Sequence, residues 1–386
     1  MPRASASLAI LVTLATTFAG SAAAESKGSF SVSRHRTSNA LDGPLELADW
    51  YTVLRGALDG KIEHEFGGTK LAAEFELKRY DTYEIENDAA VGLSAETTFR
   101  ASERLELRGS LTFRTVSEGD DIPVQGFIVG TRTRTATFGA AAQAGIQLTP
   151  DTVLVLDAGA VHEKASDTDF QEGVIEATRL QPDRDRIGVG AALIRTHGPL
   201  SYGAAASAAY LRIGAVDPLP ALELAEYTAK LQAAAILDGG ITLRAEAGVQ
   251  ALVLLNGDFR DVRPVYAVSV NMPLADGFSL RGAVQGSFDT ASGDDPLASW
   301  VHRMEAEGGY AVTADVRLGI GAFREIRENL ALSNRETAVG YFGEIVWKAS
   351  EYTTLLVRVD ATRSRFSDFA QQQQTVDAHI TLTRRL

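Results

Sequence analysis

The sequence predicts an all-β fold: a transmembrane antiparallel up-and-down β-barrel of about 18 strands. Three observations predict it. Apolar and polar residues alternate with a period of two along nearly the whole chain. Each alternating segment is close to the roughly 9 to 11 residues that a tilted strand needs to cross a bilayer, and short turns alternate with longer connections. Successive side chains of a strand point to opposite faces, so each segment has one apolar and one polar face.

The clearest hairpin covers residues 227–253. Its two strands carry apolar residues such as Leu231 on one face and polar residues such as Lys230 on the other. Between the strands lies Asp238-Gly239-Gly240, a turn sequence that suits a hairpin because glycine tolerates positive φ. A soluble hairpin has the same pattern, so its repetition along the chain is what favours a barrel.

The pattern recurs from residue 54 to the C-terminus. The predicted strands are residues 54–66, 71–78, 89–100, 105–114, 138–148, 152–161, 187–195, 200–212, 227–237, 241–253, 265–274, 278–288, 304–312, 316–323, 337–348, 352–362 and 375–386. The longer connections are residues 81–88, 115–133, 162–185, 213–225, 256–264, 289–303, 324–336 and 363–374. A membrane barrel has this arrangement, with short turns on the periplasmic side and longer loops outside.

These 17 segments are an odd number, whereas a barrel with both termini in the periplasm needs an even one. Residues 28–36 are the candidate for an additional first strand, which would give 18 strands and pair the first with the last. Closure is required because an open sheet edge in lipid leaves backbone N–H and C=O groups unsatisfied. A barrel of 16 strands is the alternative, because the first strand has a weak pattern.

Residues 1–24 read as a cleavable signal peptide, with an N-terminal arginine, an apolar run and an Ala-Ala-Ala site before Glu25. Residues 25–386 would then form the barrel in the outer membrane of a Gram-negative cell. The chain has no cysteine, and no later apolar run approaches the about 20 residues of a spanning helix. Its net charge of -13 disfavours nucleic acid as a partner.

At this point the chain resembles bacterial outer-membrane porin-like β-barrels over residues 28–386, through its architecture rather than through a motif. Within that class it is similar to the loosely defined β-barrel porin family of proteobacteria, some members of which are associated with exopolysaccharide genes. The resemblance implies lipid, lipopolysaccharide and the barrel-assembly machinery as partners. One departure is the last residue, Leu386, where such barrels usually end in an aromatic residue.

The polar faces carry the candidate pore-lining residues, because a barrel of this size is too wide for side chains to fill. They are Arg55, Asp59, Lys61, Glu63, Glu65, Glu74, Glu76, Lys78, Glu96, Arg100, Glu106, Arg108, Arg114, Lys230, Arg244, Glu246, Arg281, Arg317 and Arg358. Charge thins on this face between about residues 137 and 210. Cross-strand ion pairs that stabilise a closed wall are the alternative interpretation.

A long connection can fold inward and narrow the lumen. The 115–133 connection is the predicted constriction, with Glu118, Asp120 and Asp121 as candidate residues. The 162–185 connection is also long and acidic, and such acidic loops either bind divalent cations or, more simply, face solvent.

Catalytic signals are poor. The six histidines show no metal-ligand spacing, and no nucleophile elbow or phosphate-binding loop appears. We therefore expect no enzyme activity, no cofactor and no metal. The favoured function is a porin-like channel for passive diffusion of small hydrophilic solutes. The alternatives are a conduit for exopolysaccharide export and a closed structural or adhesion barrel.

Overall fold

The alternating segments form strands throughout the computed structural model, which describes residues 24–41, 47–124, 127–170, 176–274, 277–290, 297–367 and 372–386. The predicted signal peptide lies outside the described residues except for Ala24, the first residue of β1. Among the described residues, no helix is long and apolar enough to cross a membrane.

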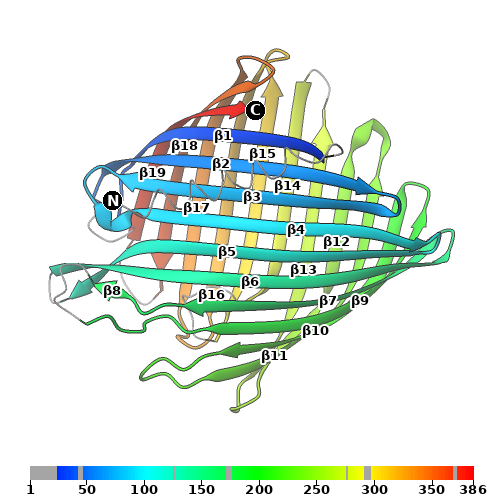
Figure 1. The fold of residues 1–386 in the computed structure, drawn as a ribbon, viewed down its shortest axis with the longest axis horizontal. Helices are drawn as coiled ribbons and strands as arrows, with labels where there is room; N and C mark the ends of the chain where they lie inside the picture. The colour runs from blue at the N-terminus through cyan, green and yellow to red at the C-terminus, as the bar shows by residue number, and fades with distance from the viewer. Residues whose placement is uncertain are drawn as a thin grey trace.

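Nineteen strands make one antiparallel sheet (Figure 1). They are β1 Ala24–Thr37, β2 Asp49–His64, β3 Gly67–Tyr80, β4 Asp88–Ser102, β5 Leu105–Val124, β6 Phe127–Thr149, β7 Thr152–Ala165, β8 Asp169–Phe170, β9 Arg184–His197, β10 Leu200–Ile213, β11 Leu222–Ile236, β12 Thr242–Leu254, β13 Arg260–Pro273, β14 Phe278–Asp289, β15 Ser299–Ala311, β16 Val316–Asn329, β17 Arg335–Lys348, β18 Thr353–Phe366 and β19 Gln372–Arg385. Among the described residues, the short 3-10 turns η1 Glu84–Glu86 and η3 Asp238–Gly240 lie in connections.

The sheet closes on itself. β1 pairs with β2 on one side and with β19 on the other, so the first and last strands of the chain are neighbours. The two-residue β8 pairs with β6 at Thr131 and Arg132, near the long-connection end, and the remaining strands form a closed barrel of 18. The prediction of 18 strands is confirmed, the 16-strand alternative is wrong, and the weakly patterned segment 28–36 lies within β1.

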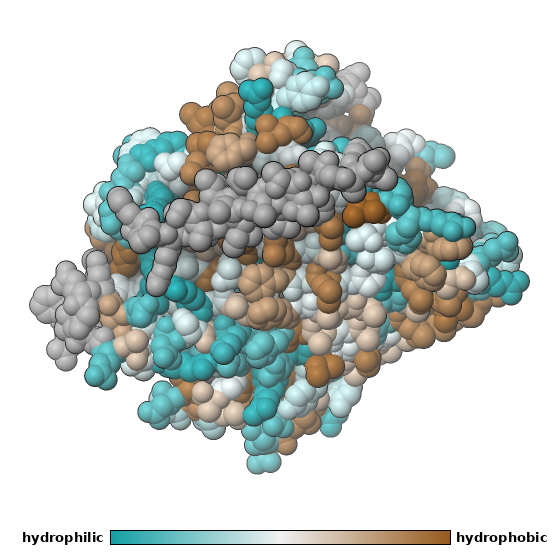
Figure 2. All heavy atoms as spheres, in the orientation of Figure 1, coloured by the Kyte–Doolittle hydropathy of each residue, from teal (hydrophilic) through white to brown (hydrophobic). Residues whose placement is uncertain are grey.

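Apolar residues stay on one face around the whole barrel. The register pairs Leu54 with Leu77, for example, and Leu355 with Leu382. Following the cross-strand partners along the middle of each ladder returns to the starting face; register shifts at Arg100/Ser102 and Gln147/Thr149 lie beside short turns. Large apolar side chains on this face are exposed, and Leu231 and Ile320 are each 68% exposed. Figure 2 shows brown hydrophobic residues interspersed with pale ones over the part of the barrel wall that is in view.

Aromatic residues mark the rim formed by the short turns. Phe66 and Phe99 meet edge to face at 6.0 Å between ring centroids, and Phe278 stacks on Tyr310 at 4.3 Å. All four belong to the apolar face or the adjoining turn, which fits a girdle at the edge of a bilayer.

The predicted 115–133 connection is not a loop. β5 and β6 continue as paired strands as far as Val124 opposite Phe127. Figure 1 shows this hairpin extending beyond its neighbours. Threonines at every second position from Thr131 to Thr137 favour strand, because β-branched side chains suit a pleated surface. The lengthened hairpin changes which segment can narrow the lumen.

Candidate functional site

The candidate site is the inner face of the barrel together with one segment that folds over it. The register places the predicted pore-lining residues on the face opposite the apolar one, with the exception of Glu65, which lies in the turn between β2 and β3. Several are about half exposed: the side chains of Arg55, Arg108 and Arg317 are 58%, 54% and 52% accessible. These charged groups therefore line accessible space inside the barrel.

Many of these charges form ion pairs along the wall. Arg55 contacts Glu76 at 2.5 Å and Lys230 contacts Glu246 at 2.6 Å, in both cases between adjacent strands. Further pairs join Lys61 with Glu63, Arg108 with Glu106, Arg317 with Glu307, and Arg358 with Glu344 and Asp360. Ion pairs between exposed side chains contribute at most about 1 kcal/mol each. Their main effect is a polar wall with local fields across the lumen.

The lumen is charged mainly on one side. Along most of β6 to β10 the inward positions hold small or uncharged residues, such as Ala141, Gln143, Gly188, Ala205 and Ser207, whereas Glu163, Arg184 and Arg186 are inward charges near the long-connection end. Asp157 is an acidic exception, and a Cβ added at the neighbouring Gly190 would lie 2.6 Å from its carboxylate. The charged inward positions on β2 to β5 are therefore separated from those on β11 to β19 by a wall of small side chains.

The described ends of the connection between β14 and β15 fold into the barrel. The ladder between β13 and β14 ends at Tyr266 opposite Gly286, whereas the ladder between β14 and β15 continues to Asp289 opposite Ser299. The end of the β14–β15 hairpin thus leaves its place in the wall. We call the described residues 287–290 and 297–301 the inward segment.

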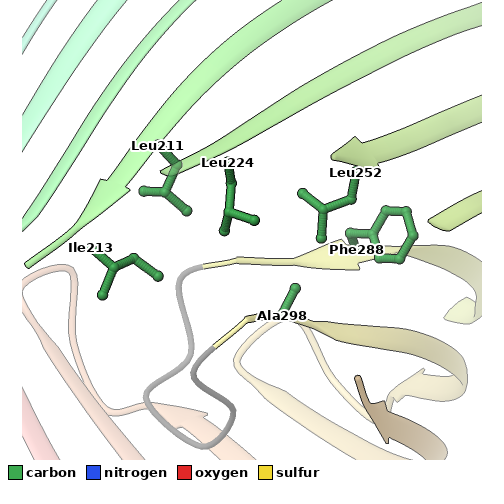
Figure 3. Packing of buried hydrophobic residues seen from close by; sticks show 6 residues of the cluster. All are labelled: Leu211, Ile213, Leu224, Leu252, Phe288 and Ala298. Carbon is green, nitrogen blue, oxygen red and sulfur yellow. The ribbon is translucent and has the colours of Figure 1, made fainter. Parts of the chain in front are cut away.

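A buried apolar cluster holds the inward segment against the inner wall. Phe288 and Ala298 of the segment pack against side chains on the inward face of β10, β11 and β12 (Figure 3). The wall contributes Leu211, Ile213, Leu224 and Leu252, which are at most 6% exposed. Full burial of a leucine or phenylalanine contributes about 1.5–3 kcal/mol. The cluster is therefore strong enough to fix the segment in place.

Hydrogen bonds tie the same segment to more distant strands. The backbone N–H of Phe288 donates to Gln250 Oε1 at 3.0 Å, and Gln250 Nε2 donates to Glu226 Oε1 at 2.8 Å. Arg186 on β9 donates from Nη2 to Glu226 at 3.0 Å and from Nη1 to Thr290 Oγ1 at 2.8 Å. Strands β10 to β13 lie between β9 and β14 in the ring, so this contact crosses the inside of the barrel.

The base of the segment is anchored by Arg263 on β13. Its guanidinium lies 5.4 Å from the Trp300 ring centroid and donates to Glu328 at 2.5 Å. Apolar packing, hydrogen bonds and a cation–π contact thus act together on the inward segment. Within the described residues, this segment lies over the inner wall of β10 to β13 near the long-connection end of the barrel.

The sequence prediction placed the constriction elsewhere. Glu118 lies in β5 opposite Thr133, and Asp120 and Asp121 follow it in the same paired strand, so the prediction of a loop at these residues is wrong. The sequence did contain one signal for the inward segment. The otherwise polar face of three neighbouring strands carries four apolar residues, Leu211, Ile213, Leu224 and Leu252. Such residues need an apolar partner inside the barrel.

The structure also shows how the acidic side chains of the 162–185 connection are arranged. In the 162–185 connection, Asp183 pairs with Arg179 and accepts a hydrogen bond from the Ala165 N–H, and Asp185 contacts His162 at 2.7 Å. Among the described residues, the acidic connections bring together no three-ligand group. One such group does form inside the barrel, from His35, Asp377 and His379, which sequence spacing did not reveal.

Comparisons with known proteins agree on the fold. No family model matches the chain, and no curated protein matches it. Among solved structures, it is similar to the copper transporter OprC (9% identity, TM-score 0.55, 94% of this chain and 81% of that one). It is also similar to OccK3 of Pseudomonas aeruginosa (12%, 0.50, 94% and 96%) and to the FrpB iron transporter of Neisseria meningitidis (9%, 0.51, 88% and 62%). The fold is that of outer-membrane β-barrel proteins, as the sequence resemblance implied.

Proposed function

We propose that the protein is an outer-membrane channel through which small hydrophilic solutes diffuse passively, selected by size and charge. The observation that carries the proposal is the one-sided constriction. The inward segment is anchored on the inner wall of β9 to β13, while accessible charged side chains such as Arg55 and Arg108 line β2 to β5. A passage between the segment and these strands is polar and water-accessible.

The charges of this passage suit small polar solutes better than lipid. Acidic and basic side chains alternate over short distances, as in the pairs Arg55–Glu76 and Lys230–Glu246. Paired charges of both signs create transverse fields that orient polar molecules without strong retention of either sign. The architectural resemblance of the chain to porin-like barrels supports the same function.

Solute uptake by liposomes tests the proposal. We expect vesicles that contain the purified barrel to swell in iso-osmotic solutions of small sugars, at rates that fall steeply as the sugar becomes larger. Empty vesicles and vesicles with heat-unfolded protein are the controls. Swelling no faster than in empty vesicles would reject passive diffusion in favour of a closed structural or adhesion barrel. For an exopolysaccharide conduit, gene deletion would instead remove surface polysaccharide and leave small-solute uptake unchanged.

We also propose that the long-connection end faces the cell exterior, within lipopolysaccharide. Exposed basic residues form a belt on the outward face near this end: Arg34, Arg36, Arg79, Arg134, Lys164, Arg212, Arg260, Arg324, Arg335, Arg363 and Arg365. Near the short-turn end, the outward face of the described strands carries only Arg195 and Arg384. Guanidinium groups bind phosphate through paired hydrogen bonds, and the phosphates of lipopolysaccharide lie in the outer leaflet.

Part of the belt is locally organised. Arg34 and Arg36 lie over the Trp50 ring at 5.3 and 5.7 Å, and Arg34 donates to Asp81 at 3.0 Å. The hydrogen bond from Arg34 lowers the pKa of the Asp81 carboxyl in the turn after β3, so this carboxylate stays charged.

Reversing the charge of the belt is expected to reduce lipopolysaccharide binding. The variant Arg335→Glu/Arg363→Glu/Arg365→Glu should retain several-fold less lipopolysaccharide after purification, because carboxylates repel its phosphates. Arg281→Glu, on the inward face of β14, is the matched control. Equal retention in the triple variant and the wild type would contradict this proposal. Export through the cleavable signal peptide and insertion by the barrel-assembly machinery belong to the same proposal.

A further inference from the structure

A compact group of residues that can bind a metal lies where the first strand, β1, pairs with the last, β19. His35 on β1 lies directly opposite His379 on β19, and Asp377 is two residues before His379. All three point to the inward face. His35 Nδ1 is 3.0 Å and His379 Nδ1 is 3.3 Å from Asp377 Oδ1. One ligand atom from each residue lies within 4.8 Å of the other two.

We propose that His35, Asp377 and His379 bind a divalent transition-metal ion of the Zn²⁺ or Cu²⁺ type, with a further coordination position open to the lumen. Two imidazoles and one carboxylate are the ligands that such borderline ions take, and catalytic-type sites use three protein ligands. Metal–ligand bonds of about 2.0–2.2 Å in a tetrahedral site set neighbouring ligand atoms roughly 3.3 Å apart. The two observed histidine–aspartate separations already have this scale, so little rearrangement is needed.

The surroundings hold these side chains in place. The side chains of His35, Asp377 and His379 are 13%, 20% and 14% exposed, so they are neither fully buried nor free in solvent. Tyr51 on β2 donates from its hydroxyl to Asp377 Oδ2 at 2.7 Å, which leaves Oδ1 directed at the histidines. The His35 ring stacks between Tyr51 and His379, each 4.4 Å away. Partners of this kind fix the orientation of metal ligands.

Nearby cations are engaged by other groups. Arg358 lies opposite His379 in the register, but its guanidinium donates to Asp360 at 2.8 Å and to Glu344 at 3.2 Å. The Lys78 ammonium lies 4.8 Å from the Tyr80 ring centroid and 3.6 Å from Asp88 Oδ2. The charge of each is therefore largely compensated locally, and the Asp377 carboxylate remains available to a metal.

The ligand chemistry also selects the class of metal. Calcium and magnesium prefer shells made of oxygen alone, and two imidazoles are poor ligands for them. The chain has no cysteine, so a soft thiolate site is excluded. The alternative that the experiment must exclude is a purely hydrogen-bonded contact without metal, because the His35–Asp377 contact also joins the first and last strands. The two interpretations differ in whether a metal binds stoichiometrically.

A titration separates them. Full-length barrel without an oligohistidine tag is purified in detergent, treated with chelator, and titrated with Zn²⁺ by calorimetry and with Cu²⁺ under electron paramagnetic resonance. We expect one ion per barrel, nitrogen hyperfine structure from the Cu²⁺ ligands, and a higher temperature for the heat-modifiable gel shift when Zn²⁺ is bound, because a ligand that binds only the folded state stabilises it.

Variants identify the ligands. His35→Asn, His379→Asn and Asp377→Asn should each weaken Zn²⁺ binding at least about tenfold, as loss of a ligand requires. His197→Asn, at the end of β9, is the matched control and should bind as the wild type does. Asp377→Asn keeps the side-chain shape and decides the question if a histidine variant fails to fold. Absence of saturable binding in the wild type, or wild-type affinity in Asp377→Asn, would overturn the site. These measurements do not depend on transport. Failure of the metal site and failure of the proposed channel function can therefore be distinguished.

Discussion

Shortening the inward segment is expected to increase passage through the barrel several-fold. Asp289 and Ser299 are already paired across β14 and β15, so residues 290–298 can be replaced by Asn-Gly, which closes a two-residue hairpin. The change removes Thr290 and Ala298, which contact the inner wall, while the strands of the ring keep their register. The liposome-swelling rate with small sugars measures the effect, and sugars that the wild type excludes should begin to enter.

A matched deletion controls for general loosening of the barrel. Replacing residues 214–221 between β10 and β11 by Asn-Gly joins Ile213 and Leu222, which are also paired. This connection supplies none of the contacts of Thr290 or Phe288 that cross the lumen, so its loss should leave the swelling rate close to wild type. If both deletions had the same effect, or if the first had none, the inward segment would not be the constriction.

Placing a positive charge on the apolar face is expected to cost the barrel about 2–4 kcal/mol, the penalty for arginine near the bilayer midplane. Leu231→Arg makes this change near the middle of β11, where Leu231 is 68% exposed between Ala204 and Ala247. Gln232→Arg is the control on the inward face. There Glu246 lies directly opposite, so the new charge has a partner and accessible space.

The free energy of unfolding of the barrel in lipid vesicles, measured by urea titration, compares the two variants with the wild type. Leu231→Arg should unfold at much lower urea, and Gln232→Arg close to wild type. Equal losses in the two variants would mean that the two faces of β11 are not divided between lipid and water. If Leu231→Arg left the free energy of unfolding unchanged, this face of β11 could not be assigned to lipid.

Most of the fold was predictable because it depends on local periodicity. The alternation about Asp238-Gly239-Gly240 predicted the β11–β12 hairpin, and the odd count of clear segments predicted a further strand at residues 28–36. Strand length was less predictable. β5 and β6 continue to Val124 and Phe127, because each supplies the hydrogen-bond partners that the other needs beyond the wall.

The site was predictable only in part. Parity alone placed Arg55, Lys230 and Arg358 on the inward face, because a strand fixes the direction of each side chain. The inward segment forms because the hydrogen-bond ladder between β13 and β14 ends at Tyr266 opposite Gly286. No local sequence pattern predicts where such a ladder ends. The contact between His35 and Asp377 joins residues 342 positions apart, and only closure of the barrel brings them together.

Single-channel recording in planar bilayers tests the central claim most directly, that the lumen beside the inward segment is an open water-filled passage. The wild-type barrel is predicted to carry a steady ionic current that rises in proportion to salt concentration and is unchanged by chelator. The heat-modifiable gel shift establishes that the inserted barrels are correctly folded. If such barrels carried no current above that of the bare membrane, the account would be contradicted.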